Sequence, residues 1–350
     1  MEQHEKYPNI DTQLPQADAE RMNLCSISTY RTELMGLAMI FIVLFHIPLS
    51  RWDPFFGLRR MGNIGVDMFL FLSGVGLWFS WVRHPDWKRF ITRRYLRVYP
   101  AWLIMASLYY IPRFRGGDIM AWIDLIGDIT INWDFWLNDE LTFWYVPAIM
   151  MLYLFAPAYM HLIRKHAVCR WLPVMMIMWC VAVQWVGPIH DTVGHIEIFW
   201  SRVPIFFIGI NMGEQVRRKQ SIDSAGMRMV AMMFILGLGT CVYLEQMKHG
   251  KFPLFIERML YIPLTLTAIL IINKLLDHLS ERARWALRFI GLISLEFYLI
   301  HVHFVLNFLP KSWSYWPMFI VCFIATLPLA WLLNKIAGHI SARVSKLLPE

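Results

Sequence analysis

An imidazole at the end of an apolar helix is the first candidate for chemistry in this chain. His46 ends the run Leu34-Met-Gly-Leu-Ala-Met-Ile-Phe-Ile-Val-Leu-Phe-His46, and Arg31 precedes it by fifteen residues. A titratable group inside a bilayer costs free energy, which makes such a residue a candidate for function. The imidazole can remove a proton from a hydroxyl nucleophile. The alternative is a structural histidine bonded to a neighbouring helix, and position alone favours neither interpretation.

A carboxylate at matching depth is a possible partner for His46. If the first helix enters from the cytoplasm, His46 lies near its outer end. Asp67 then lies about one turn into the second helix, which starts outside. A carboxylate that accepts the Nδ1 proton of an imidazole fixes its tautomer and leaves Nε2 free as a base. We therefore expect Asp67 to orient His46, with pairing of Asp67 to an arginine as the structural alternative.

A basic cluster precedes the third apolar segment. The stretch Phe90-Ile-Thr-Arg-Arg-Tyr-Leu-Arg-Val-Tyr-Pro100 spaces Arg93, Arg94 and Arg97 three and four residues apart, on one side of a helix. Guanidinium forks bind phosphate oxygens in bidentate fashion. A donor with several phosphates and a long flexible arm, such as coenzyme A, suits this entrance. The alternative is a topology determinant that contacts lipid headgroups.

Three more polar residues fall inside apolar segments. Arg202 is costly in lipid and should face the bundle interior, with Glu197 or Asp67 as its partner. Glu296 and His301 are five residues apart and do not share one face of a helix closely. For both we expect structural hydrogen bonds rather than catalysis.

The composition places all these residues in a membrane protein. Of 350 residues, 57% are hydrophobic and 17% are charged, and the mean hydropathy is +0.45. These values are typical of a polytopic membrane protein. The net charge of +8 reflects topology and contact with anionic membrane lipid, and requires no nucleic-acid partner. The five cysteines show no paired spacing, so the sequence predicts neither a metal site nor a disulfide framework.

Apolar stretches of about bilayer length predict an all-α integral membrane protein with about ten transmembrane helices in one bundle. The stretches fall near residues 34–50, 64–82, 98–112, 142–160, 171–187, 196–213, 229–246, 254–273, 292–309 and 317–337. Lys and Arg are about twice as frequent in the connections on one side, which places both termini in the cytoplasm. The predicted organisation is a cytoplasmic tail over 1–30, a transmembrane domain over 31–340 and a second cytoplasmic tail over 341–350.

The longest connection, about 113–141, mixes acidic and aromatic residues. Its apolar residues recur at three and four, which predicts an amphipathic helix on the outer surface for part of it. Such a loop suits a polar acceptor, for instance a sugar whose faces stack on indole rings. A helix that only lies in the membrane interface is the alternative.

Five segments, in this order, resemble the acyltransferase 3 family of integral membrane acyltransferases. They are Glu33–His46, Val66–Gly74, Arg93–Pro100, Phe143–Pro147 and Ser294–His301, and the resemblance covers roughly residues 30 to 335. Members O-acylate or N-acylate surface glycans, lipids and small molecules. The resemblance implies a multi-pass protein of the bacterial plasma (inner) membrane that uses an acyl-CoA donor, usually acetyl-CoA, and no metal.

The resemblance also implies roles for individual residues. His46 matches the family histidine taken to be essential, and Arg94 with Arg97 matches its pair of arginines on the inner side. The family arginine eleven positions before the histidine is Met35 here, and Arg31, one turn earlier, is the nearest replacement. The polar residues expected to contact substrate or to act structurally are Trp144, Tyr145, Arg202, Glu296 and His301.

The predicted enzyme is an O-acyltransferase that modifies a polysaccharide or a lipid-linked sugar of the cell envelope. The donor's phosphates are held by Arg93, Arg94 and Arg97. His46, with Asp67 and Arg31 in the catalytic set, acts as general base or is itself acylated as a relay across the membrane. The sequence does not separate these routes.

Two other classes of protein remain as rivals. A proton-coupled transporter of a glycan or lipid precursor would use His46, Asp67, Arg202 and Glu296 as a proton relay. No inverted repeat is evident, and transport does not call for a phosphate-binding cluster at one entrance. A structural membrane scaffold would tolerate replacement of His46.

Overall fold

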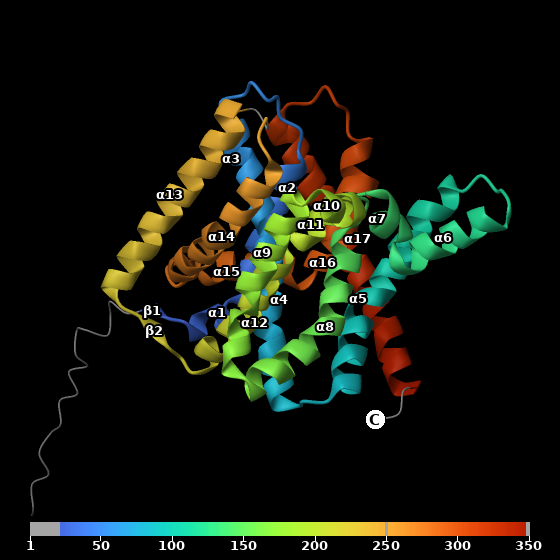
Figure 1. Cartoon of the computed structure of the whole chain (residues 1–350). Coiled ribbons are helices and arrows are strands. Elements are labelled where there is room, and N and C mark those ends of the chain that lie inside the picture. The colour runs from blue at the N-terminus through green and yellow to red at the C-terminus, as the bar shows by residue number, and fades with distance from the viewer. Residues whose placement is uncertain (1–21, 249–250, 348–350) are drawn as a thin grey trace, which may run out of the picture.

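Helices make up almost all of the chain in a computed structural model that describes residues 22–248 and 251–347 (Figure 1). The first half contains α1 (Cys25–Thr29), α2 (Arg31–His46), α3 (Phe56–Arg60), α4 (Ile64–Arg83), α5 (Trp87–Tyr110), α6 (Ile119–Ile131), α7 (Trp133–Asn138) and α8 (Tyr145–Lys165). The second half contains α9 (Leu172–Trp185), α10 (Gly187–Val193), α11 (Glu197–Trp200), α12 (Val203–Arg217), α13 (Ser224–Lys248), α14 (Leu254–Leu276), α15 (Glu281–Leu292), α16 (Ser294–Ile300) and α17 (Tyr315–Leu347). Two short strands, β1 (Met22–Asn23) and β2 (Ser221–Ile222), pair antiparallel.

All ten apolar stretches that the sequence predicts as spans fall on helices. Among the described residues, six helices are long and apolar enough to cross a membrane, and the number rises to eight if each of two bent pairs is one span. The helix α2 has only 16 residues, and α5 has a basic first half. The fold is therefore an all-α arrangement with six to eight candidate spans, and the orientation of the termini stays a prediction.

The structured chain extends beyond the predicted limits of the transmembrane domain. Most of the predicted N-terminal tail, residues 1–21, lies outside the described residues, but β1 and α1 follow it. At the other end, α17 continues to Leu347, past the predicted start of the C-terminal tail at 341.

The helix α5 begins earlier than the hydropathy pattern indicates. Its first residue is Trp87, and the Asp86 side chain caps it by accepting a hydrogen bond from the Arg89 backbone N–H. The predicted span started at residue 98 because the basic residues interrupt the apolar run. Arg94 and Arg97 therefore lie within a continuous helix, as their spacing predicts.

The bundle is built around α4. This helix is mainly apolar, and most of its residues are buried. The helices α2 and α12 both pack on it. Its one carboxylate, Asp67, is therefore surrounded by protein and must find a partner there.

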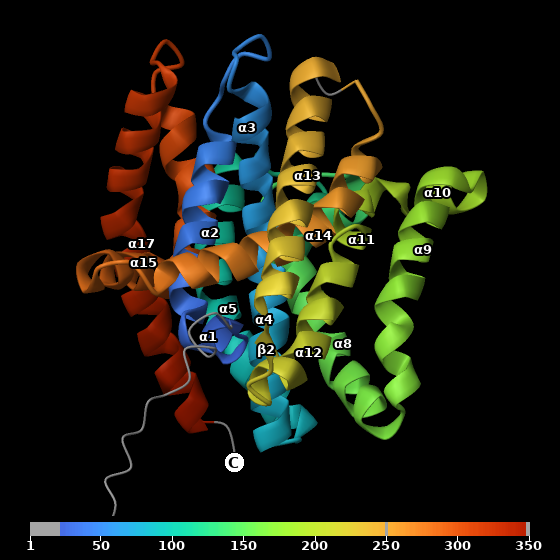
Figure 2. The ribbon, with the colours of Figure 1, turned by 90° about the vertical axis from the view of Figure 1, so that its left-hand side faces the viewer.

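The helix α15 crosses the bundle instead of running along it (Figure 2). It is bent by 62° from the following stretch, Ser294–Phe308. Its contact with α2 is backbone against backbone: an added Cβ at Gly36 would lie 2.0 Å from a backbone oxygen of α15, and one at Gly291 would lie 1.9 Å from a backbone oxygen of α2. This close approach places the start of α16 beside the first turns of α2.

We expect Gly291→Ala to destabilise the fold, because neither backbone can move away without breaking its helix. Overpacking of this kind costs roughly 1–3 kcal/mol. Thermal unfolding of the detergent-purified protein measures the loss. The matched control is Gly239→Ala in α13, where an added Cβ meets nothing within 4 Å. An unchanged unfolding temperature for Gly291→Ala would contradict the close contact between α2 and α15.

The helix α6 extends away from the bundle (Figure 1). Its N-cap, Asp118, accepts a hydrogen bond from the Ala121 backbone N–H. The apolar side chains that it leaves exposed include Ile119, Met120, Trp122, Ile123 and Ile126. The helix predicted within 113–141 is thus present, and exposed apolar side chains in that pattern are typical of contact with a membrane interface.

Candidate active site

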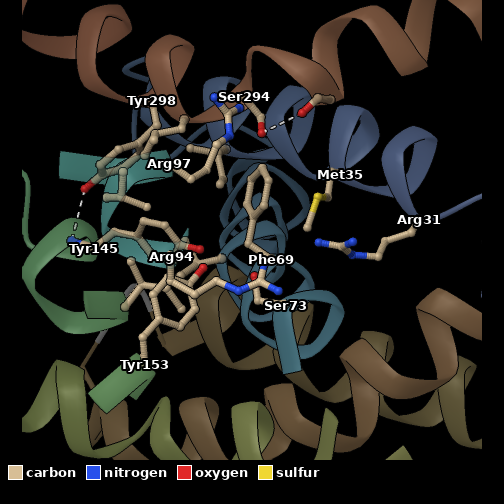
Figure 3. A pocket seen from close by; sticks show the side chains of 16 residues that line it. Arg31, Met35, Phe69, Ser73, Arg94, Arg97, Tyr145, Tyr153, Ser294 and Tyr298 are labelled. Carbon is tan, nitrogen blue, oxygen red and sulfur yellow. Dashed lines mark hydrogen bonds between the residues drawn. The ribbon is translucent and has the colours of Figure 1, made fainter. Parts of the chain in front are cut away.

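A cavity of about 290 Å³ lies between α2, α4, α5, α8, α15 and α16 (Figure 3). Its lining includes Arg31, Met35 and Ile42 of α2, Phe69 and Ser73 of α4, Arg94 and Arg97 of α5, Tyr145 and Tyr153 of α8, and Ser294 and Tyr298 of α16. From Arg31 to Ile42, α2 advances roughly 16 Å, at about 1.5 Å per residue. The cavity therefore runs from a cationic end at the start of α2 toward the level of His46.

Two arginines give the cavity its charge. The Arg31 and Arg94 side chains extend into it from opposite walls (Figure 3). Within the described residues, neither forms an ion pair with an acidic side chain. Arg31 donates from Nε to the Leu72 carbonyl at 3.1 Å. The Arg94 guanidinium lies 5.5 Å from the Phe90 ring centroid, and its Nε is buried without a hydrogen-bond partner in the described chain. Uncompensated cations at a cavity favour an anionic ligand.

Arg97 differs from these two because a carboxylate neutralises it. Its guanidinium lies 3.2 Å from Glu296 and also donates to the Leu292 carbonyl at 3.0 Å. The buried Glu296 accepts a second hydrogen bond from Asn334 at 3.0 Å. Glu296 therefore links α5, α16 and α17, and Arg97 has less positive charge to offer a ligand than Arg94 has.

The third arginine of the basic cluster lies elsewhere. Arg93 is exposed and does not line the cavity. The expectation that Arg93, Arg94 and Arg97 share one site is therefore wrong for Arg93. The third arginine of the cavity lining is Arg31 of α2. The physical reason is that adjacent residues point about 100° apart around a helix, so Arg93 and Arg94 face different sides of α5.

A glycine of α4 makes room for Arg31. An added Cβ at Gly76 would lie 2.7 Å from Cζ of the Arg31 guanidinium. The absence of a side chain at this position lets the guanidinium lie flat against α4. Sequence reasoning did not single out five uncharged residues, although three of them lie in the family segments Val66–Gly74 and Ser294–His301. They are Phe69, Ser73, Gly76, Tyr153 and Ser294.

Asp67 does not contact His46. Its carboxylate is paired with Arg202, and both side chains are buried. Arg202 also donates to Asn63 at 3.2 Å. The expected orientation of His46 by Asp67 is therefore wrong, and the alternative of an arginine partner is present. The physical reason is that a buried guanidinium is charged and needs a carboxylate, whereas a neutral imidazole does not. Glu197, the other possible partner of Arg202, pairs instead with Arg258 at 2.9 Å.

The half-buried His46 has other partners for its ring. Nδ1 lies 2.8 Å from the Ile42 carbonyl oxygen and 3.3 Å from Nε2 of His301. Ile42 and Tyr298 both line the cavity, one helical turn before His46 and His301. The histidine pair therefore lies just beyond the apolar end of the cavity, opposite its cationic end.

Trp144 and Tyr145 of the Phe143–Pro147 segment lie in different surroundings. Tyr145 lines the cavity, and its ring centroid lies 5.4 Å from that of Tyr298. The Tyr145 backbone N–H donates a hydrogen bond to the Tyr298 hydroxyl oxygen at 3.3 Å. Trp144 is half-buried and packs near Phe135, with ring centroids 6.4 Å apart, outside the cavity lining. Tyr145 is thus the member of the pair that can meet a ligand.

A second cavity, of about 630 Å³, lies on the other side of α5 and α8. Its walls are mainly apolar and aromatic and include Tyr95, Tyr99, Trp102, Trp133, Trp136 and Pro147. Phe143 connects this cavity with the histidines, because its ring centroid lies 5.7 Å from that of Trp102 and 4.5 Å from that of His303. The first cavity therefore leads toward His46 and His301, and the second leads, through Phe143, toward His303, which is two residues after His301.

Comparison with known proteins identifies the family of this chain. The model of the acyltransferase domain, acyltransferase 3 type, matches residues 34–335, nearly the whole chain. The chain belongs to the acyltransferase 3 family. The resemblance carried by the sequence motifs is confirmed, and the acyltransferase 3 chain is accordingly an acyltransferase with several apolar membrane helices.

Other similarities of this acyltransferase 3 protein are limited. It is 33% identical to "Regulator of hypoxia-inducible factor 1" of Caenorhabditis elegans over 132 residues, which cover 32% of this chain and 26% of that protein. The match thus spans about a quarter of the relative. No solved structure matches the chain. Among the described residues, no group of three or more His, Cys, Asp or Glu side chains is placed to hold a metal ion.

Proposed function

We propose that the chain transfers an acyl group, acetyl in the first instance, from acyl-CoA to a hydroxyl of a glycan or lipid-linked sugar in a bacterial envelope. The donor enters from the cytoplasmic side of the inner membrane. The single observation that carries this proposal is the pair Arg31 and Arg94, which face one cavity without an acidic partner among the described residues.

The charge and the length of the cavity support acyl-CoA as the donor. Arg31 and Arg94 bind the diphosphate of coenzyme A, and Arg97 adds a contact from the same wall. At about 290 Å³ the cavity is near the lower limit of ligand pockets, which begin at about 300 Å³, so it takes the pantetheine arm rather than the whole molecule. The arm extends past Phe69 and Tyr145 toward Ile42 and brings the thioester to the level of His46.

His46 supplies the proton transfer. In the direct route, the acceptor hydroxyl oxygen attacks the thioester carbonyl while its proton moves to Nε2 of His46. The carbon–sulfur bond then breaks, and the imidazolium returns the proton to the leaving thiolate. In the relay route, Nε2 itself attacks the thioester carbonyl, the carbon–sulfur bond breaks, and coenzyme A leaves as the thiolate. In a second step the acceptor hydroxyl oxygen attacks the acyl carbon, the carbon–nitrogen bond breaks, and the hydroxyl proton passes to the released Nε2. Rapid-quench trapping of acyl-histidine without acceptor separates the two routes.

The second cavity is our candidate for the acceptor. Indole and phenol rings stack on sugar faces, and its apolar walls suit the tail of a lipid-linked sugar. The Phe143 ring lies between Trp102 of this cavity and His303. An acceptor held there approaches the donor from the His303 side without sharing the donor's path.

We expect Gly76→Ala to weaken acetyl-CoA binding, since the new methyl group displaces the Arg31 guanidinium from its place on α4. A loss of about 1 kcal/mol raises the Kd roughly fivefold. Calorimetric titration of the purified protein with acetyl-CoA measures it. Gly338→Ala in α17, where an added Cβ meets nothing within 4 Å, is the control. Unchanged affinity in Gly76→Ala would show that Arg31 does not bind the donor.

Transfer of label tests the proposed function. Inside-out membrane vesicles that contain the chain are supplied with radiolabelled acetyl-CoA, and the glycolipid and polysaccharide fractions are counted. We expect label in one of these fractions, and none above background with His46→Gln. Absence of label, together with proton-coupled uptake of a glycan precursor, would favour the transporter.

A further inference from the structure

His301 is held so that only one of its ring nitrogens can accept a hydrogen bond. Nδ1 lies 2.9 Å from the Tyr298 carbonyl oxygen and 3.1 Å from that of Phe297. Carbonyl oxygens only accept, so Nδ1 carries a hydrogen. The ring is fully buried, and no ion pair of the described residues includes it. A buried imidazole without a carboxylate is neutral, so its Nε2 has a free lone pair.

That lone pair is directed at His46. Nε2 of His301 lies 3.3 Å from Nδ1 of His46, and the two rings meet edge to face, with centroids 5.0 Å apart and planes at 75°. Nδ1 of His46 also faces the Ile42 carbonyl oxygen at 2.8 Å. Both neighbours are acceptors, which requires a hydrogen on Nδ1 of His46. Its Nε2 is then the unprotonated nitrogen.

The Ile42 carbonyl alone would hold the His46 ring less firmly than the carbonyl and His301 do together. In an α-helix this oxygen already accepts the backbone N–H four residues later, which is that of His46. His301 supplies an acceptor from another helix, and its edge-to-face packing limits rotation of the His46 ring. The π-helical stretch His301–Val305 interrupts the regular α-helix at this point, and π-helical turns are frequent at functional sites.

We propose that His301 is a positioning residue, which holds His46 in the Nδ1–H tautomer and presents Nε2 as the base or nucleophile. It takes the role that we expected for Asp67. The catalytic consequence rests on the proposed function, whereas the tautomer of His46 does not depend on it.

Nitrogen NMR of the full-length protein, labelled with ¹⁵N in the histidine rings, tests the tautomer directly. A difference spectrum against His46→Gln assigns the two His46 signals. We expect a protonated Nδ1 and an unprotonated Nε2 in the wild type, and a mixture of tautomers in His301→Leu. His301→Gln keeps an acceptor oxygen and should restore the wild-type pattern. His339→Gln, which changes an exposed histidine bonded only to its own helix, is the control.

The result that overturns the proposal is a protonated Nε2 of His46 in the wild type, or an unchanged His46 spectrum in His301→Leu. If His301→Leu fails to fold, the wild-type spectrum and His301→Gln still decide the question. In the transfer assay we expect His301→Leu to lower kcat roughly 10- to 100-fold, with the KM for acetyl-CoA changed less than about twofold. His301→Gln should recover most of that loss. A wild type without transfer would refute the proposed function and leave the tautomer result standing.

Discussion

His46→Gln should lower acyl transfer by roughly 10²- to 10⁴-fold, which is the usual contribution of a general base. Glutamine keeps a polar side chain of similar reach but cannot take up a proton near neutral pH. Acetyl-CoA binding should change less than about twofold, because His46 lies beyond the arginines and outside the cavity lining. Transfer in the vesicle assay and calorimetric titration with acetyl-CoA measure the two quantities.

The control for this substitution is again His339→Gln, which makes the same chemical change at an exposed position of α17. Its transfer rate should match that of the wild type. If His46→Gln retained normal transfer, another group would serve as the base, and the scaffold role of His46 would be favoured.

Arg31→Gln combined with Arg94→Gln should weaken acetyl-CoA binding about 100-fold or more. Hydrogen bonds to charged groups contribute about 1.5–3 kcal/mol each, and about 1.4 kcal/mol corresponds to a factor of ten. Neither arginine has an acidic partner in the described chain, so their removal exposes no buried carboxylate and should leave folding largely intact.

The neighbouring arginine provides the matched control. Arg93→Gln removes the same charge from an exposed position outside the cavity lining and should change affinity less than about twofold. Dephospho-CoA, which lacks the 3′-phosphate, should bind the wild type better than acetyl-CoA binds the double variant, because the cavity holds the diphosphate. Equal losses in Arg93→Gln and the double variant would indicate general electrostatic attraction in place of a site.

The sequence predicted the helices well where apolar residues run without interruption. It failed where charge or a bend interrupts the pattern. The first half of α5 was left out of the predicted span because its basic residues interrupt the apolar run, although the spacing of its arginines did indicate a helix. The helix α15 was not predicted as a span because charged residues interrupt its apolar pattern, and its crossing of the bundle depends on the close backbone contact between α15 and α2 at Gly36 and Gly291.

Some residues of the candidate site could be predicted from the sequence, and their partners could not. His46 and Arg94 could be found from their types and positions, because a histidine in an apolar run and an arginine at a helix entrance are visible locally. The side chains that Asp67 and His46 contact could not be found in this way. Asp67 meets an arginine 135 residues away, and His46 meets a histidine 255 residues away. Such pairings depend on how the helices pack against one another, and the packing cannot be read from a single sequence.

The most direct measurement is an electron cryomicroscopy structure of the protein with acetyl-CoA bound. The account predicts density for the diphosphate between Arg31 and Arg94, and for the thioester beside Ile42 and Tyr298, within reach of Nε2 of His46. Well-defined acetyl-CoA density elsewhere on the protein, with this cavity empty, would contradict it.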